Sequence, residues 1–503
     1  MEPKEPWEDY YTCPDKREAE LAFPTGKREF LFGVLLFLSA LCLCNFTVYG
    51  GFHLGFALGV IASVLCSFCY LLASGRKIGG YSGSLLFLSV VIAAGFARSD
   101  DGFVKFVMVC FLLISVNLGL CLQAGQNLRS TGSVGSLLDA PRGLFIFGLG
   151  NLFPAFRGIG ERFRNGGAAV KKSGGLLLGL CLCIPVLAVM IPLLISADAA
   201  FDGLVGLLPE FEGEELFATL LFGSILWSIL YSRGTALRHR EKSEHTPRTP
   251  KGIPAITVNT VLWAVCLLYG VYLLSQLAYL SGGFAGILPK GYSLAQYARR
   301  GFFEMVCLCG VNLTVTVLSL GLVKKEGNAP LMSRLLCLFI YLVNLFLVAA
   351  AGAKMVFYIS AYGLTRLRVL TEIIMLFMAV TTVVLGVWLF VPKLPYMRAV
   401  LLAALIIGAA TLWADVDTCV ARYNVNAYLS GTLETVDIEH LKSLGDGALP
   451  YIRRLAEEAP DVVVSGRAKS YLTKVTEYGP KDFRDWNYVN HKAPAYRWVL
   501  NEK

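Results

Sequence analysis

Residues 30–49 read FLFGVLLFLSALCLCNFTVY, a stretch without one charged side chain. A helix needs about 20 mostly apolar residues to cross the roughly 30 Å hydrocarbon core of a bilayer. Further stretches of this kind follow at 52–74, 81–97, 103–124, 174–196, 216–232, 256–280, 302–323, 335–356, 369–391 and 397–415. The sequence therefore predicts an all-α, polytopic helical membrane protein with about 11 transmembrane helices.

The overall composition agrees with burial in lipid. Of the 503 residues, 55% are hydrophobic and 16% are charged, whereas soluble domains carry about 25% charged residues. A soluble protein of this composition would expose large apolar patches to water. Because lipid offers no partners for free backbone N–H and C=O groups, continuous apolar runs favour helices.

The sequence gives no sign of a metal, a cofactor or a known catalytic motif. Most of the 14 cysteines lie within the predicted spans, where they serve as small apolar side chains. The chain contains no P-loop, no H-E-x-x-H, no G-x-S-x-G and no kinase motif set. We therefore predict no metal site and no cofactor. The lack of a catalytic motif favours a protein that is not an enzyme.

Basic residues are distributed unevenly among the loops between the predicted spans. They concentrate in the N-terminal tail and in alternate loops, whereas loop 197–215 has neither Lys nor Arg. Since Lys and Arg are enriched in cytoplasmic loops, the pattern predicts a cytoplasmic N-terminus and an extracytoplasmic C-terminus. The net charge of +9 is then explained by inner loops that meet anionic headgroups, and nucleic acid is not needed as a partner.

Spans and loops together predict five parts of the chain. They are a cytoplasmic tail, a four-helix membrane region, a basic cytoplasmic loop, a second membrane region and a small extracytoplasmic helical module, at 1–29, 30–124, 125–173, 174–415 and 416–503. In the basic loop, Leu152, Phe153 and Phe156 lie beside Arg157. That pattern favours a helix lying against anionic lipid, and the alternative is a short re-entrant or packed segment.

A first group of candidate site residues lies before the span at 302–323. Tyr297, Arg300 and Glu304 share one helix face, and Arg299 lies beside them. Arg300 and Glu304 can pair across one turn, and such a pair is costly in the bilayer unless it faces protein or water. It is either a clamp for a phosphate or carboxylate ligand or an internal ion pair that fixes helix packing.

Two further groups fall on the same predicted side. Arg366 and Arg368 come just before a span that begins near Glu372. After the span at 397–415, the helix is expected to continue outward, with Asp415 and Arg422 on one stripe. Asp417 is near enough to share Arg422 or a neighbouring arginine, and Asn424 marks the expected end of that helix. All these residues are candidates for an extracytoplasmic ligand site.

The tail after residue 432 contains short amphipathic helices. Asp437 can cap a helix that carries Ile438 and Leu441, and a second helix carries Ile452 and Leu455. Because such helices cannot bury their apolar faces alone, we expect them to dock onto each other or onto the membrane region. The aromatic residues of 482–498 suit a membrane interface or a protein partner.

Several of these motifs resemble one known family. They are YARRGFFEM (297–305), YGLTRLR (362–368), ARYNVNAYL (421–429), DIEHLKSLGDGALPYIRRL (437–455) and DFRDWN (482–487). Together they resemble domain of unknown function 4173 (DUF4173), a bacterial multi-pass membrane family related to DUF4153, over roughly residues 170–500. The resemblance implies a bacterial plasma-membrane protein and supports the topology, but it brings no established chemistry.

Three functions remain open at this point. The first is a binding, scaffold or sensing protein whose tail meets a protein partner. The second is a transporter or flippase for an anionic or lipid-linked substrate, in which the arginines converge on one cavity. The third is a membrane enzyme acting on lipid or cell-wall precursors, with Glu304, Glu372, Asp415 or Asp417 as acid or base. We favour the first, because no catalytic pattern is present.

Overall fold

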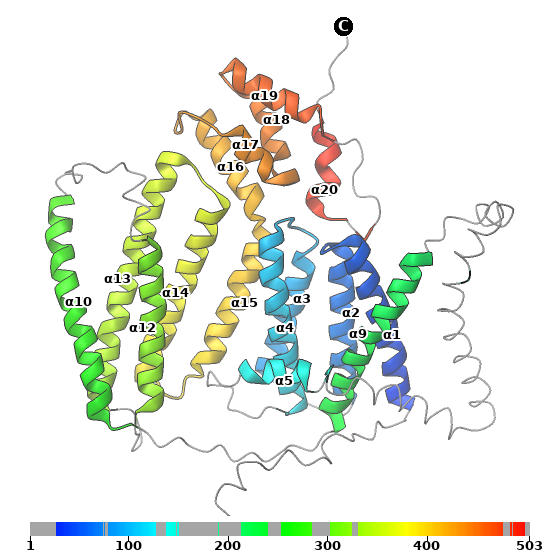
Figure 1. The fold of residues 1–503 in the computed structure, drawn as a ribbon, viewed down its shortest axis with the longest axis horizontal. Coiled ribbons are helices and arrows are strands. Elements are labelled where there is room, and N and C mark those ends of the chain that lie inside the picture. Colours follow the sequence, from blue (N-terminus) through cyan, green and yellow to red (C-terminus); the bar gives the residue numbers. More distant parts are fainter. Residues whose placement is uncertain are drawn as a thin grey trace, which may run out of the picture.

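The computed structural model describes residues 27–73, 75, 79–126, 137–146, 148–149, 190, 213–239, 253–283, 302–323, 330–475, 483–484 and 486–497. This part of the chain is helical, and apart from one isolated bridge between Ile253 and Val323 it contains no β pairing. Figure 1 shows long helices standing side by side, with shorter helices above one end of them. The fold class predicted from the sequence is confirmed.

Nine of the described helices are long and apolar enough to cross a membrane, and α3 is apolar but shorter. Their bounds, together with α3 and the short α5, are α1 Lys27–Gly50, α2 Leu54–Leu72, α3 Gly80–Gly95, α4 Gly102–Ala124, α5 Asp139–Phe145, α9 Gly213–His239, α10 Ala255–Gly283, α12 Phe302–Leu322, α13 Leu331–Tyr362, α14 Arg366–Phe390 and α15 Tyr396–Ala414. The predicted spans match these helices, except for 174–196, which lies outside the described residues apart from residue 190.

The first membrane group consists of α1 to α5 and α9. Helix α1 packs closely on α2 and on α9, because small residues let the backbones approach. A Cβ added at Gly59 would lie 2.7 Å from Leu43, and one at Gly223 would lie 2.7 Å from Leu41. Trp227 of α9 completes the contact by donating from Nε1 to the carbonyl of Gly33, at 2.9 Å.

The second membrane group consists of α10, α12, α13 and α14, and a chain of buried polar side chains crosses all four helices. Tyr269 donates to Asn312 at 2.7 Å, Asn312 to Asn344 at 3.2 Å, and Asn344 to Thr382 at 2.8 Å. Each of these amide and hydroxyl groups thus has a hydrogen-bond partner away from lipid, and this row of side chains connects the four helices.

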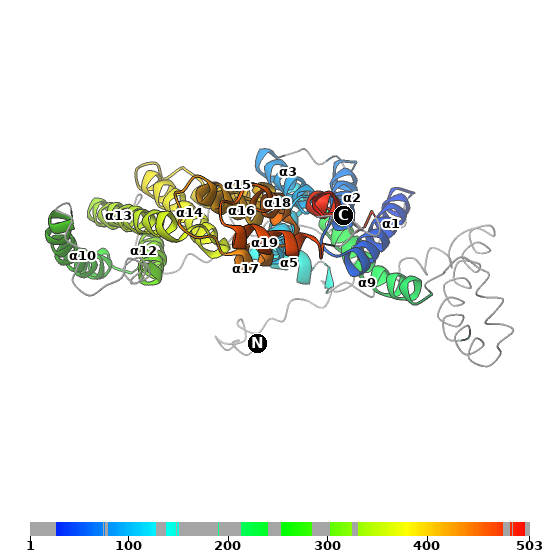
Figure 2. The ribbon, with the colours of Figure 1, turned by 90° about the horizontal axis from the view of Figure 1, so that it is seen from above.

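Helix α15 joins the two groups, and Figure 2 shows it between α14 and α3. Gly95 of α3 fits against Leu412, since a Cβ there would lie 2.8 Å from that side chain. Trp413 at the end of α15 donates to the carbonyl of Val91 at 3.0 Å. The end of α15 is therefore fixed against α3, at the place where the C-terminal module begins.

The C-terminal module contains α16 Val416–Leu429, α17 Ile438–Ser443, α18 Leu449–Glu458, α19 Val462–Leu472 and α20 Tyr488–Lys492, with short 3₁₀ turns at Gly445–Ala448 and Ala493–Tyr496. Val420, Leu441, Ile452, Leu455 and Leu472 are fully buried in one shared apolar core. The amphipathic helices thus dock onto each other and onto α16, as expected. Asp437 caps α17 by accepting from the backbone N–H of His440 at 3.0 Å.

Two details of the expected outward helix are wrong. The helix does not continue through Asp415, which has a φ of +53° and separates α15 from α16. Aspartate tolerates this left-handed conformation better than most residues, and its carboxylate accepts from the Thr418 hydroxyl at 2.5 Å. Asn424 does not end α16 either: the helix runs on to Leu429, because the Asn424 side chain bonds to a neighbouring segment instead of to its own backbone.

Candidate functional site

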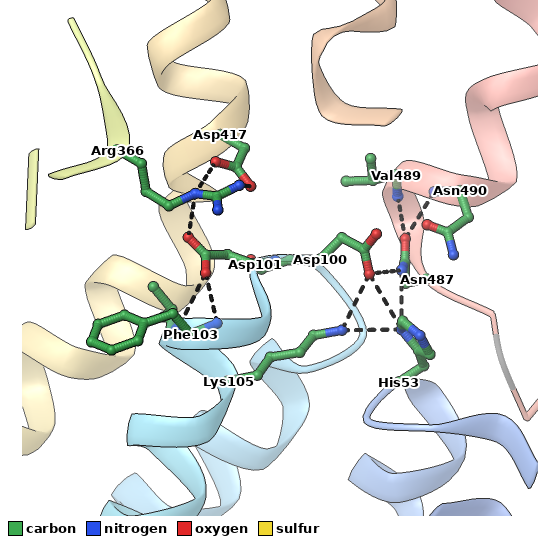
Figure 3. A network of polar contacts seen from close by, with 12 residues as sticks. His53, Asp100, Asp101, Phe103, Lys105, Arg366, Asp417, Asn487, Val489 and Asn490 are labelled. Carbon is green, nitrogen blue, oxygen red and sulfur yellow. Dashed lines mark hydrogen bonds and ion pairs between the residues drawn. The ribbon is translucent and has the colours of Figure 1, made fainter. Parts of the chain in front are cut away.

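Polar side chains from both membrane groups meet the C-terminal module at one end of the helices. We call this set the polar layer, and it consists of His53, Asp100, Asp101, Lys105, Arg366, Asp417 and Asn487 (Figure 3). These residues come from the start of α2, the α3–α4 loop, the first turns of α4 and α14, the start of α16 and the segment before α20. Residues far apart in sequence are therefore joined at one level of the molecule.

Asp101 is placed by its role as the N-cap of α4. Its Oδ1 accepts from the backbone N–H groups of Phe103 and Val104, at 2.9 and 3.1 Å. Aspartate is a favoured N-cap, because its oxygen pairs with first-turn N–H groups that have no partner inside the helix. The other oxygen, Oδ2, lies 3.2 Å from Nε of Arg366, and the Asp101 side chain is 0% exposed.

Arg366 stands at the first position of α14 and reaches toward the module. Its Nε and Nη2 donate to the two carboxylate oxygens of Asp417, both at 2.7 Å. Such a paired, charge-assisted contact fixes both distance and orientation. Arg366 therefore has one carboxylate from the membrane helices and one from the module, and it links the two.

The module side of this contact is acidic. Burial raises the pKa of Asp417 to about 6, together with the nearby charges of Asp101 and Asp415, although the bond to Arg366 acts in the opposite direction. Burial also raises the pKa of Asp415. Asp415 also lies near Arg98, so the carboxyl group most easily protonated here is that of Asp417, which can take up a proton under mildly acidic conditions.

The other half of the polar layer is built around His53. Nδ1 of His53 accepts from Nζ of Lys105 at 3.1 Å and from Nδ2 of Asn487 at 3.0 Å. Both donors also contact Oδ1 of Asp100, at 3.5 Å from Lys105 and 3.3 Å from Asn487. Since an ammonium group can only donate, Nδ1 of His53 carries no proton in this arrangement.

A segment near the C-terminus closes the ends of α1 and α2. The N–H groups of Leu54 and Gly55, in the first turn of α2, donate to the carbonyls of Trp486 and Arg484, at 3.1 and 3.2 Å. Arg484 also contacts Glu215 and donates to Asn45 at 3.1 Å. A Cβ at Gly50 would lie 2.6 Å from Arg484, so this close approach requires glycine.

The family described as Domain of unknown function (DUF4153) matches residues 83–455. The chain belongs to the DUF4153 family. The matched range runs from α3 into α18, so it includes the Asp101–Arg366–Asp417 contact but excludes His53 and Asn487. Searches of curated proteins and of solved structures gave no match.

The structure of this DUF4153 protein brings part of the predicted site together. Arg366 and Asp417 pair directly, so of the two expected partners of Asp417, Arg422 or a neighbouring arginine, the structure has the second, and Arg422 is exposed on α16. Asn424 accepts from the N–H of Leu364 at 2.6 Å and donates to its carbonyl at 2.8 Å. The segment before α14 and helix α16 therefore form one unit.

Other predicted residues lie apart from this unit. Arg368 donates to the carbonyls of Tyr362 and Gly363 and stacks over the ring of Tyr358, with 4.1 Å from its guanidinium carbon to the ring centroid. Glu372 is half-buried along α14, and its Oε1 has no hydrogen-bond partner among the described residues. The predicted clamp residues Tyr297, Arg299 and Arg300 and the side chain of Glu304 lie outside the described part.

The sequence reasoning missed the residues that complete the polar layer. Asp101 had a usable signal, because an aspartate directly before the apolar run of α4 is a typical N-cap. Lys105 and Asn487 had none, since a lysine near the start of a span usually snorkels to water. Within the described part of the chain, no three His, Cys, Asp or Glu side chains are placed to hold one metal ion.

Proposed function

We propose that this DUF4153 protein is a binding or scaffold protein of the bacterial plasma membrane, whose C-terminal module senses or holds a partner outside the cytoplasm. The N-terminus is then cytoplasmic, and the basic loops on that side meet anionic headgroups. Residues 416–503 form the outer module. The motifs YARRGFFEM and YGLTRLR further support a close relation to DUF4173.

The main support is that Arg366 is already bound on both sides. Nε and Nη2 of its guanidinium donate to Asp417, and Oδ2 of Asp101 lies 3.2 Å from Nε; both carboxylates are almost completely buried, at 0% and 6% side-chain exposure, whereas the Arg366 side chain is 36% exposed. A transporter or enzyme that used this arginine for substrate would need it free to meet a ligand. A closed ion-pair cluster instead suits a joint that holds the module in a fixed position on the membrane helices.

The module also carries an apolar surface suited to a partner. Val462 and Val463, in the first turn of α19, are 84% and 60% exposed. Asp461 caps that turn by accepting from the N–H of Val463 at 2.8 Å. The turn is therefore ordered while its two valines face solvent, which leaves them available to a partner.

The test combines two substitutions on this surface with a substitution in the membrane. Val462→Asp/Val463→Asp should remove the phenotype of the wild-type gene at unchanged protein level, because these side chains support no core. A photo-reactive residue at position 463 should form a specific adduct in cells, whereas one at Lys469, on the last turn of α19, serves as the matched control. If the valine variant complements fully while Asn344→Leu abolishes function at normal levels, transport through the second membrane group would be the better explanation.

The proposed orientation has its own test. Cys419 is an exposed thiol on α16, outside the spans. A membrane-impermeant maleimide should label it in intact cells, and Cys419→Ser should abolish that labelling. Labelling that requires cell lysis would place the module in the cytoplasm and contradict the proposed location of the partner.

A further inference from the structure

Arg233 is a buried cation without an ion-pair partner among the described residues, although the buried residue Asp139 of α5 lies at the same end of α4, against Cys121. It lies within the membrane-spanning part of α9 and is only 4% exposed. Nη1 donates to Oδ1 of Asn117 on α4 at 3.0 Å, and Nε is buried without a hydrogen-bond partner. Among the residues that the structure describes, no carboxylate lies within ion-pair distance of it.

This arrangement is costly unless something else supplies the negative charge. An arginine near the end of a span normally extends to the interface, where water and headgroups solvate the guanidinium. Arg233 does not extend in this way, because its side chain is covered by α4 and α9. A buried charge without a counter-ion is strongly destabilising, so Arg233 indicates that an anion belongs beside it.

The surroundings of Arg233 lie at the membrane face opposite the polar layer. Helix α4 runs from Asp101 in the polar layer to its other end at Ala124, and α5 lies across that end (Figure 1). A Cβ at Gly143 of α5 would lie 3.0 Å from Sγ of Cys121 and 3.4 Å from Cβ of Asn117. The backbone of α5 is therefore pressed onto the part of α4 that faces Arg233.

A second guanidinium lies at the same end of α4. Arg142 on α5 donates from Nη1 to the carbonyl of Gln126, just after the end of α4, at 3.1 Å. This contact keeps α5 on the helix end and brings another positive charge to this level of the membrane. Two arginines where a span meets the headgroup region are the usual chemistry for phosphate recognition.

We propose that Arg233 binds a phosphate group between α4, α5 and α9, most directly the phosphate of an anionic phospholipid from the adjacent leaflet. The planar guanidinium offers neighbouring N–H groups that match two phosphate oxygens, and Nε is the donor left without a partner. Asn117 holds the opposite edge of the guanidinium and so sets its orientation. This site is independent of the proposed role of the outer module.

The test measures which lipids stay bound to the purified full-length protein. Wild-type protein in nanodiscs of phosphatidylglycerol and phosphatidylcholine should retain phosphatidylglycerol after detergent exchange, as seen by native mass spectrometry. Arg233→Gln should lower its affinity about tenfold, the loss expected for a charge-assisted contact. Arg453→Gln is the matched control, because it removes the same charge from the exposed pair with Glu457 and should leave retention unchanged.

Two further experiments identify the source of the phosphate and control for misfolding of Arg233→Gln. If inorganic phosphate alone raises the melting temperature of delipidated wild-type protein but not of the variant, the ligand is free phosphate. Arg233→Lys keeps the charge but loses the planar fork, so it should fold and still bind more weakly, which covers a failure of Arg233→Gln to express. Equal retention by wild type and both variants, or no effect of either ligand, would overturn the proposal.

Discussion

Replacing Arg366 with methionine should release the C-terminal module from the membrane helices. The substitution removes the two 2.7 Å bonds to Asp417 and the 3.2 Å ion pair with Asp101 while keeping most of the side-chain volume. Two buried carboxylates would then face each other without a counter-ion. Removing one partner of a buried pair costs about 3–5 kcal/mol, and we take the lower value because the Arg366 side chain is 36% exposed.

A loss of about 3 kcal/mol corresponds to roughly a hundredfold change in a local opening equilibrium. Hydrogen exchange measured by mass spectrometry should therefore be roughly a hundredfold faster in the first turns of α4 and α16 of the variant, with little change in α10. Arg368→Met is the control, since its guanidinium bonds only to backbone carbonyls and the Tyr358 ring.

Adding Asp101→Asn and Asp417→Asn to Arg366→Met should restore much of the protection, because the carboxylates left behind cause most of the cost. Unchanged exchange in Arg366→Met, or a triple variant no better than the single one, would refute the view that this ion pair holds the module.

Three other outcomes follow from the same region and from the second membrane group. Asn424→Ala removes the two bonds to the N–H and the carbonyl of Leu364 and should destabilise the module by about 1–3 kcal/mol, measured as a lower melting temperature. The pKa of Asp417 is raised from its usual 3.8 to about 6. Protonated Asp417 therefore stabilises the folded state fully below pH 3.8, and this contribution to the free energy of unfolding is lost as the pH rises through about 6. Asp417→Asn should flatten this part of the pH profile of unfolding. Asn344→Leu breaks the polar chain to Thr382 and should reduce thermal stability in detergent without changing the exchange of α16.

The membrane helices could be predicted from the sequence because a single signal determines them. In lipid, the length of an apolar run and the need to pair backbone groups leave few alternatives to a helix. The docking of the module was also predictable, since Leu441, Ile452 and Leu455 lie at helical spacing and need a shared core. These inferences depend only on side chains near one another in sequence.

The candidate site depends on contacts between distant segments, and local patterns do not contain them. Arg366 was expected in the site, but its partner Asp101 lies in the α3–α4 loop, far away in sequence. The break at Asp415 was missed because nothing in the surrounding sequence requires a positive φ there. Asn487 reaches His53 only because the chain returns to the membrane after α19.

The contact of Leu54 and Gly55 with the carbonyls of Trp486 and Arg484 has a consequence for biogenesis. Helix α2 enters the bilayer early in translation, yet the groups that complete its first turn are synthesised hundreds of residues later. Until that late segment has been synthesised and has docked, the nascent protein carries an unfinished first turn of α2. A chain that stopped before Arg484 would therefore leave these N–H groups of α2 without their partners, even when every earlier helix is correctly folded.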